Sequence, residues 1–195
     1  MCIILIGNRQ SIEAQDLPRL WVNNPHGAGV AYTFKRKVVA IKGLMSLKSL
    51  EFALSKIDKN QQIAVHLRLA THGSINRQNT HPHRCGNTVL MHNGVLSNFG
   101  ESGTGKNSRS DSADLADTIK DLPLGSKLKV LSSLHGKFCL VTSQGIEVIN
   151  PESWIEYQGV LASNSQIKPV IEVKYNRKDY IWQNEIMDWK LPDND

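Results

Sequence analysis

The chain has 195 residues, of which 40% are hydrophobic and 21% are charged, and its formal net charge at pH 7 is +5. This composition is typical of a globular domain, and no apolar run is long enough to span a bilayer. The short apolar start at Cys2–Ile6 lacks the basic residues of a signal peptide, so we expect a cytoplasmic protein.

The cysteines give little support to a disulfide framework. The chain has three of them, Cys2, Cys85 and Cys139, and no C-x-x-C pair. An odd number in this spacing argues against structural disulfides and against a cysteine zinc site. Cys139 lies in an apolar run, where we expect a buried and inert thiol. Cys2 differs from the others because it is the second residue of the chain.

The first half of the chain is predicted to consist mainly of strands. Strands are expected over residues 1–6, 27–34, 37–42, 63–69 and 88–92, with a helix over residues 47–57 and an irregular stretch over residues 73–86. The helix follows Ser46, a suitable N-cap, and has leucines at helical spacing. In the strand over 63–69, His66 and Arg68 alternate with apolar residues, so one face of that strand is polar.

The second half is predicted to alternate helices with strands. Phe99–Ser110 is expected to be a polar loop, and Ser110 or Asp111 to cap a helix ending near Asp121. A second helix is expected over residues 127–134, strands over 137–142, 146–150, 160–163 and 170–175, and then an aromatic tail with Tyr180, Trp182 and Trp189. No repeat or linker is present, so we expect a single domain over residues 1–195, with sheets inside and helices outside.

Positive charge is concentrated in the middle of the chain. Residues 59–110 contain six Lys or Arg residues, one acidic residue (Glu101) and five of the seven histidines. Such a segment forms either a solvated positive face or a region that attracts an anionic ligand or partner. No block of Lys and Arg with interleaved aromatic residues indicates nucleic-acid binding.

Four segments carry the residues suited to chemistry. In chain order they are Met1-Cys2, then His66-Leu-Arg-Leu-Ala-Thr-His-Gly73, then Asn79-Thr-His-Pro-His83 leading to His92-Asn-Gly-Val-Leu-Ser-Asn98, and finally Ser110-Asp-Ser-Ala-Asp114. In this order and spacing they resemble the class II glutamine amidotransferases, above all the glutaminase domain of the glutamine–fructose-6-phosphate aminotransferases. The resemblance covers roughly residues 1–165, including Gly159-Val-Leu-Ala-Ser-Asn164, and leaves residues 166–195 as a tail. It implies the α+β fold of the N-terminal-nucleophile hydrolases, a four-layer αββα sandwich.

Cys2 can combine a nucleophile and a base in one residue. Removal of Met1 would make Cys2 N-terminal, and a side chain as small as that of Cys permits this removal. A free α-amine has a pKa of about 7.7–8.0, so it is partly neutral and can accept the proton of its own thiol. Taken alone, Cys2 would be interpreted as a buried strand residue, and the other motifs favour the nucleophile.

The resemblance implies roles for the residues around the nucleophile. The Asn93 side-chain amide and the Gly94 N–H would hold the oxyanion, Arg68 would bind the substrate carboxylate, and Asp111 would bind its ammonium group. These groups suit those roles, because Asn donates two N–H bonds and Arg can bind a carboxylate in a bidentate manner. From the residues alone, a hairpin turn at Asn93-Gly94, a surface ion pair of Arg68 and a helix cap at Asp111 remain alternatives.

Further residues resemble the walls of the glutamine pocket. Thr71 and His72 resemble pocket-lining residues, and His81 a wall residue rather than a base. The segment Asn24–Gly29 resembles the turn that faces the nucleophile, and His26 is expected either to reach the site or to belong to a simple turn.

The sequence also departs from the family pattern. Ile3 follows the nucleophile where many relatives have Gly, Leu69 stands where Trp is frequent, and Ala113 replaces an acidic residue. None of these changes removes a group assigned to bond-making, but they affect the expected glutamine affinity.

The implied function is hydrolysis of L-glutamine to glutamate and ammonia through a Cys2 thioester, without a metal or organic cofactor. Because residues after about 165 leave no room for a synthase domain, the ammonia is expected to pass to a partner synthase. Alternatives are a free-standing amidohydrolase for another γ-glutamyl-type amide and a catalytically silent binding module of the same fold. A metallohydrolase with His81, His83 and either His66 or His92 as ligands is a further alternative.

Overall fold

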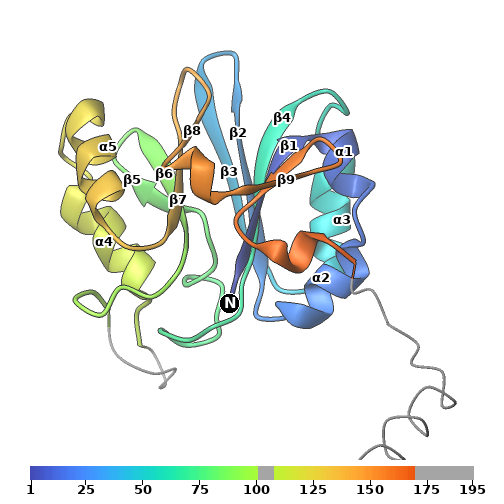
Figure 1. Ribbon diagram of the computed structural model, residues 1–195, viewed down its shortest axis with the longest axis horizontal. Helices are drawn as coiled ribbons and strands as arrows, with labels where there is room; N and C mark the ends of the chain where they lie inside the picture. The colour runs from blue at the N-terminus through green and yellow to red at the C-terminus, as the bar shows by residue number, and fades with distance from the viewer. Residues whose placement is uncertain (101–107, 170–195) are drawn as a thin grey trace, which may run out of the picture.

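A computed structural model of the chain describes residues 1–100 and 108–169, and it shows two antiparallel sheets flanked by helices (Figure 1). In chain order the elements are β1 (Ile3–Asn8), α1 (Arg9–Glu13), α2 (Leu17–Asn23), β2 (Ala28–Phe34), β3 (Lys37–Leu44), α3 (Leu47–Ser55), β4 (Gln62–Leu67), β5 (His83–Cys85), β6 (Thr88–Asn93), α4 (Asp111–Ile119), α5 (Leu124–Ser133), β7 (Lys137–Val141), β8 (Ile146–Val148), η1 (Pro151–Ser153), β9 (Ile155–Tyr157), β10 (Val160–Ala162) and η2 (Ser165–Ile167). The expected strand over 170–175 and the aromatic tail lie outside the described residues.

The first strand of the chain, β1, is an interior strand of the larger sheet. Its six strands have the order β3-β2-β4-β1-β10-β9, and the smaller sheet has the order β5-β6-β7-β8. Strand β1 pairs antiparallel with β4, with Ile3 opposite Leu67. Cys2, which precedes β1, therefore lies beside the residues that follow β4.

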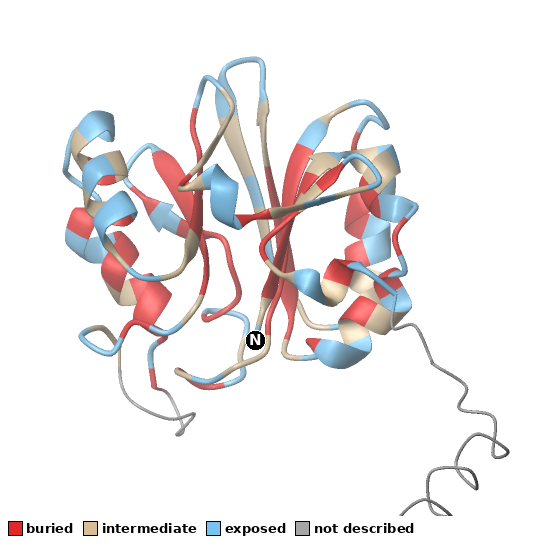
Figure 2. Cartoon of the chain, viewed as in Figure 1, coloured by how far each residue is buried: buried red, intermediate tan, exposed pale blue. Residues whose placement is uncertain are grey.

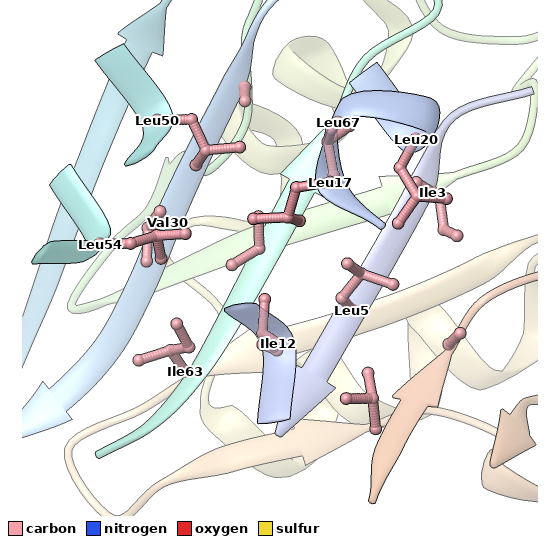
Figure 3. Packing of buried hydrophobic residues seen from close by; sticks show 14 of the residues in the cluster. Ile3, Leu5, Ile12, Leu17, Leu20, Val30, Leu50, Leu54, Ile63 and Leu67 are labelled. Carbon is pink, nitrogen blue, oxygen red and sulfur yellow. The ribbon is translucent and has the colours of Figure 1, made fainter. Parts of the chain in front are cut away.

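Strand β1 is apolar on both faces because both faces are covered. Ile3 and Leu5 pack with α1, α2 and α3, whereas Ile4 and Ile6 pack in the layer between the two sheets. Figure 3 shows the first of these layers, where Leu50 and Leu54 of α3 meet the sheet. Full burial of one such side chain contributes about 1.5–3 kcal/mol, so the N-terminal strand is firmly held.

A third apolar layer lies between the smaller sheet and α4 and α5. Leu115 and Ile119 of α4 pack there against Leu90, Phe138 and Leu140 of the sheet. The buried residues accordingly follow the two sheets and the inward faces of the helices (Figure 2). The layers run helix, sheet, sheet, helix, which is the expected α+β αββα sandwich.

Several sequence predictions agree with the structure. The β2–β3 hairpin is present, and α3 begins at Leu47 after its N-cap Ser46, which forms a capping box with Ser49. The sequence prediction missed α1, α2 and β9, and the stretch over 73–86 that was expected to be irregular contains β5. Among residues 1–100 and 108–169, no helix is long and apolar enough to cross a membrane.

Candidate active site

The predicted segments meet around one small cavity. It is lined by Cys2, Arg68, Leu69, Ala70, Thr71, His72, His81, His92, Gly94, Ser110, Asp111 and Ser112. Every candidate site residue except Asn93 is among them, and Asn93 lines a neighbouring cavity that shares Gly94. The volume is about 20 Å³, which is room for about one water molecule. An amino acid would therefore enter only if the walls moved apart.

Cys2 is fixed against the backbone that follows β4. Its Sγ lies 3.3 Å from both the N and the O of Leu69, and Asn164 Nδ2 donates to Cys2 O over 2.7 Å. Burial raises the pKa of the Cys2 thiol, and the Leu69 backbone contact and the charge of Arg68 offset only part of that rise. A thiol held in this state requires a base before it can attack.

Arg68 is buried rather than exposed. It is 3% exposed, and its guanidinium donates to three successive carbonyls, at 2.7 Å to His72 O, 3.1 Å to Gly73 O and 3.0 Å to Ser74 O. No carboxylate forms an ion pair with Arg68 within the described ranges, so the alternative of a surface ion pair is wrong. Burial lowers the pKa of Arg68, while the neighbouring Cys2 and Asp111 raise it, so the three groups lie within electrostatic reach of one another.

Asp111 connects α4 to the loop after β6. Its Oδ2 accepts from Leu96 N over 2.9 Å, and its Oδ1 accepts from Ser112 N over 2.7 Å. Ser110 is the N-cap of α4, since its side chain accepts from Ala113 N. Asp111 therefore does not serve as the cap, and this buried residue lines the cavity together with Ser110 and Ser112.

Asn93 ends β6 and is tied to the larger sheet. Its Nδ2 donates to Ser163 Oγ over 2.8 Å, and the same oxygen accepts from Ile4 N over 2.8 Å. Asn93 Nδ2 has a second proton that can donate elsewhere. Among the described residues after Asn93, the next strand begins at Lys137, and residues 94–100 contain none, so Asn93-Gly94 is not a hairpin turn.

Gly94 is required by close packing. A Cβ built there would lie 2.7 Å from His92 Nε2 and 3.3 Å from Gly136 Cα. No side chain fits without displacing the imidazole. Gly94 lies at the wall of the cavity.

A cluster of buried histidines lies at the cavity, and two of its members, His81 and His92, line it. The ring centroids of His66 and His81 are 3.9 Å apart, those of His81 and His83 are 4.5 Å apart, and His92 Nδ1 lies 2.9 Å from Ser112 Oγ. Burial lowers the pKa of His66 to about 3 and of His92 to about 4, so both rings are neutral near pH 7. In the part of the chain that the structure describes, no group of three or more His, Cys, Asp or Glu side chains is arranged to hold a metal ion. The metallohydrolase alternative thus lacks a ligand set there.

The turn over Asn24–Gly29 lies beside the segment that contacts the nucleophile. Ala70 N donates to His26 Nδ1 over 2.9 Å, and Arg68 N donates to Gly27 O over 2.8 Å. His26 thus holds the backbone next to Leu69 and does not line the cavity itself.

Some positioning residues were not predicted from the sequence. Ser163 and Asn164 lie in a segment quoted for its resemblance, but their contacts with Asn93 and Cys2 depend on pairing between distant strands. Asn79 similarly joins Ser74 O to Ser110 N.

Comparison with known proteins identifies relatives of one kind. No family model matches the chain. The glutamine–fructose-6-phosphate aminotransferase (isomerizing) of Caulobacter vibrioides is 34% identical over 140 residues, which cover 65% of this chain and 23% of that protein. The enzyme of the same name from Pyrococcus horikoshii is 34% identical over 108 residues, covering 52% and 18%. The chain thus spans less than a quarter of the length of these curated relatives.

The fold agrees with a second group of glutamine-dependent enzymes. The glutamine phosphoribosylpyrophosphate amidotransferase of B. subtilis, solved with ADP and GMP, superposes with a TM-score of 0.54 at 23% identity, covering 84% of this chain and 42% of that one. The curated relatives and the structural neighbours that this chain resembles are both class II glutamine amidotransferases. The four-layer α+β sandwich described above is the N-terminal-nucleophile hydrolase fold of these amidotransferases.

Proposed function

We propose that this amidotransferase domain hydrolyses L-glutamine to glutamate and ammonia, with Cys2 as the nucleophile. The observation that carries the proposal is the meeting of Cys2, Arg68, Gly94 and Asp111 around one cavity, although they come from four separate segments. A thiol, a backbone donor, a cation and a carboxylate are the groups that an amide-cleaving site for an α-amino acid needs.

The proposed reaction starts with removal of Met1. Met1 is 69% exposed, so an aminopeptidase can reach it. The freed α-amine of Cys2 then accepts the thiol proton, and Sγ attacks the side-chain amide carbon of glutamine. The resulting oxyanion is held by Asn93 Nδ2 and the Gly94 N–H, each of which supplies a donor that does not have to reorganise.

The second half of the reaction releases both products. The Cys2 ammonium returns its proton to the departing nitrogen, and ammonia leaves a γ-glutamyl thioester on Sγ. Water, deprotonated by the same amine, cleaves the thioester to glutamate and restores the thiol. These steps use only groups of this chain, so we propose that no metal or organic cofactor is needed.

Glutamine binding is proposed to replace contacts that the protein makes with itself. Arg68 would exchange its carbonyl partners on residues 72–74 for the substrate carboxylate, and Asp111 would exchange a backbone N–H for the substrate ammonium. Thr71, His72 and His81 would form the surrounding wall. This exchange would widen the cavity from about 20 Å³ to the size of the substrate.

The ammonia is proposed to serve a synthase. The relatives are named aminotransferases, and the chain matches less than a quarter of their length. We propose that a partner synthase receives the ammonia, and that residues 1–195 form one glutaminase domain of a cytoplasmic enzyme. A free-standing amidase for another γ-glutamyl amide is the second candidate, favoured by the same cavity and by the thiol.

The test is glutamate release from L-glutamine by protein whose loss of Met1 has been confirmed by intact mass. We expect release that survives EDTA, disappears in Cys2→Ala and persists in Cys85→Ala, since Cys85 lies in the core beside α4 and α5. No release from protein that begins at Cys2, combined with cleavage of another γ-glutamyl amide, would favour the second candidate. No cleavage of any such amide would leave the silent binding module.

A further inference from the structure

A second cavity lies next to the histidine cluster, on a part of the surface rich in cations. It has a volume of about 390 Å³ and is lined by Lys42, Gln78, Asn79, His83, Arg84, Arg109, Ala113 and Asp117. His83 borders it, and the ring of His81, 4.5 Å away, borders the active-site cavity. The cavity is therefore a separate space that shares a wall with the active site.

The cations of this cavity come from three separate elements. Lys42 is on β3, Arg84 is on β5, and Arg109 precedes α4. They converge although the segments are far apart in sequence, and the buried side chains of Asn79 and His83 form the floor. Two of the basic residues in the segment 59–110, Arg84 and Arg109, thus line this one cavity.

Two of these cations have no carboxylate partner. Lys42 Nζ donates to Gln78 O over 2.9 Å and Arg84 Nη1 to Gly86 O over 3.3 Å, and within residues 1–100 and 108–169 neither forms an ion pair. Arg109 is bound by Asp114 at 2.7 Å and by Asp117. Burial, and to a lesser degree the nearby charges of Arg109 and Arg68, lower the pKa of Lys42 to about 8.

We propose that this cavity binds a small phosphate-bearing anion, held by Lys42, Arg84 and Arg109. Guanidinium groups match the oxygens of a phosphate in a bidentate manner, and a lysine adds a movable point charge. The cavity is larger than a phosphate group, and the side-chain amide of Gln78 can bind a polar remainder of the ligand.

A ligand in this cavity would lie against Asn79, whose side chain holds the backbone beside Arg68 and Asp111. Asn79 Nδ2 donates to Ser74 O, which also accepts from Arg68, and Asn79 Oδ1 accepts from Ser110 N over 3.0 Å. Arg109 is the residue before Ser110 in the chain. Anion binding is thus expected to stabilise the wall of the active-site cavity. An effect of this on catalysis rests on the proposed glutaminase function, whereas the binding of the anion does not rest on it.

The test is calorimetric titration of the whole chain with inorganic phosphate at low ionic strength. We expect saturable binding at one site, made about tenfold weaker by Lys42→Met or by Arg84→Met, the loss typical of one charge-assisted hydrogen bond. Arg84→Met is included because Lys42 also holds the backbone of Gln78. Lys35→Met is the matched control, since Lys35 and Arg36 line a different basic cavity at the tip of the β2–β3 hairpin.

The outcome does not depend on glutaminase activity. Cys2→Ala protein is expected to bind phosphate as well as the wild type, so failure of the catalytic proposal leaves this result intact. Binding that does not saturate, or that Lys35→Met weakens as much as Lys42→Met does, would overturn the proposal by showing a general charge effect. Binding of a short single-stranded DNA with far higher affinity than phosphate, lost in Lys42→Met, would also overturn it in favour of a polymeric ligand.

Discussion

Replacing Ser163 by alanine tests whether the two sheets are joined at the reacting atoms. The Ser163 hydroxyl accepts from Ile4 N on one sheet and from Asn93 Nδ2 on the other, each over 2.8 Å. The change removes one oxygen atom and leaves the backbone bond from Ser163 N to Ile4 O in place. It therefore isolates the contribution of the bridge.

The size of the effect follows from burial. Ile4 is fully buried and Ser163 is 3% exposed, so water cannot replace the lost acceptor. An unsatisfied buried donor costs about 1–3 kcal/mol, and Asn93 can partly compensate by turning its amide. We expect a loss of about 2–4 kcal/mol in the free energy of unfolding for the two donors together.

Catalysis should fall more than substrate binding. A freely turning Asn93 amide would no longer aim its second proton at the oxyanion, and complete loss of such a donor lowers kcat by about 10²–10³. We expect at least a tenfold fall in kcat with little change in KM, because the proposed mechanism assigns substrate binding to Arg68 and Asp111. Ser163→Thr, which keeps the hydroxyl, should restore part of the rate.

Urea unfolding and glutamate release measure the two effects. Ser55→Ala is a suitable control, because that hydroxyl donates to Phe52 O on the exposed side of α3. Wild-type stability together with wild-type kcat in Ser163→Ala would refute the bridge between the sheets. An increase in KM alone would show that Ser163 acts on the substrate pocket instead.

Three further predictions concern packing, pH and charge. Gly94→Ala should destabilise the fold by about 1–3 kcal/mol because its Cβ would lie 2.7 Å from His92 Nε2, whereas Gly125→Ala, with open space around it in α5, should be neutral or stabilising in thermal melts. His66 and His92 have pKa values of about 3 and 4 in the fold, against about 6.5 when unfolded. Their contribution to the free energy of unfolding is therefore complete above pH 6.5 and is lost as pH falls toward 3, by at most about 1.4 kcal/mol per histidine and pH unit. A flat stability profile from pH 7.5 to 5 in urea titrations would contradict this. Arg68→Lys should raise KM for glutamine at least tenfold in steady-state assays, because one ammonium cannot replace a bidentate guanidinium.

The sequence predicted those helices and strands that are specified by residues close together in the chain. The capped amphipathic helix α3 and the β2–β3 hairpin are specified by neighbouring residues, and both are found. Helices α1 and α2 have only five and seven residues, so packing of Ile12, Leu17 and Leu20 on the sheet stabilises them rather than any long periodicity. Strand β5 has three residues and exists through its pairing with β6.

The segments of the site were predictable, but their contacts were not. Motif order indicated which residues would gather, and Cys2, Arg68 and Asp111 do line one cavity. That Arg68 would bind its own loop depends on how residues 72–74 fold back toward it. The Ser163 contact with Ile4 joins residues 159 positions apart, and only the register of β1 with β10 determines it.

The apolar layer between the sheets has a consequence for the rate of reaction. Cys2 is attached to the six-stranded sheet, whereas Asn93 ends a strand of the four-stranded sheet. Ile4, Met91 and Cys139 fill the space between them. If Cys2 and Asn93 act as proposed, the thickness of this layer sets the distance between the sulfur and the amide, and adding or removing one methyl group there would change turnover without altering any reacting group. Laboratory evolution for faster turnover should accordingly select interior substitutions that never contact the substrate.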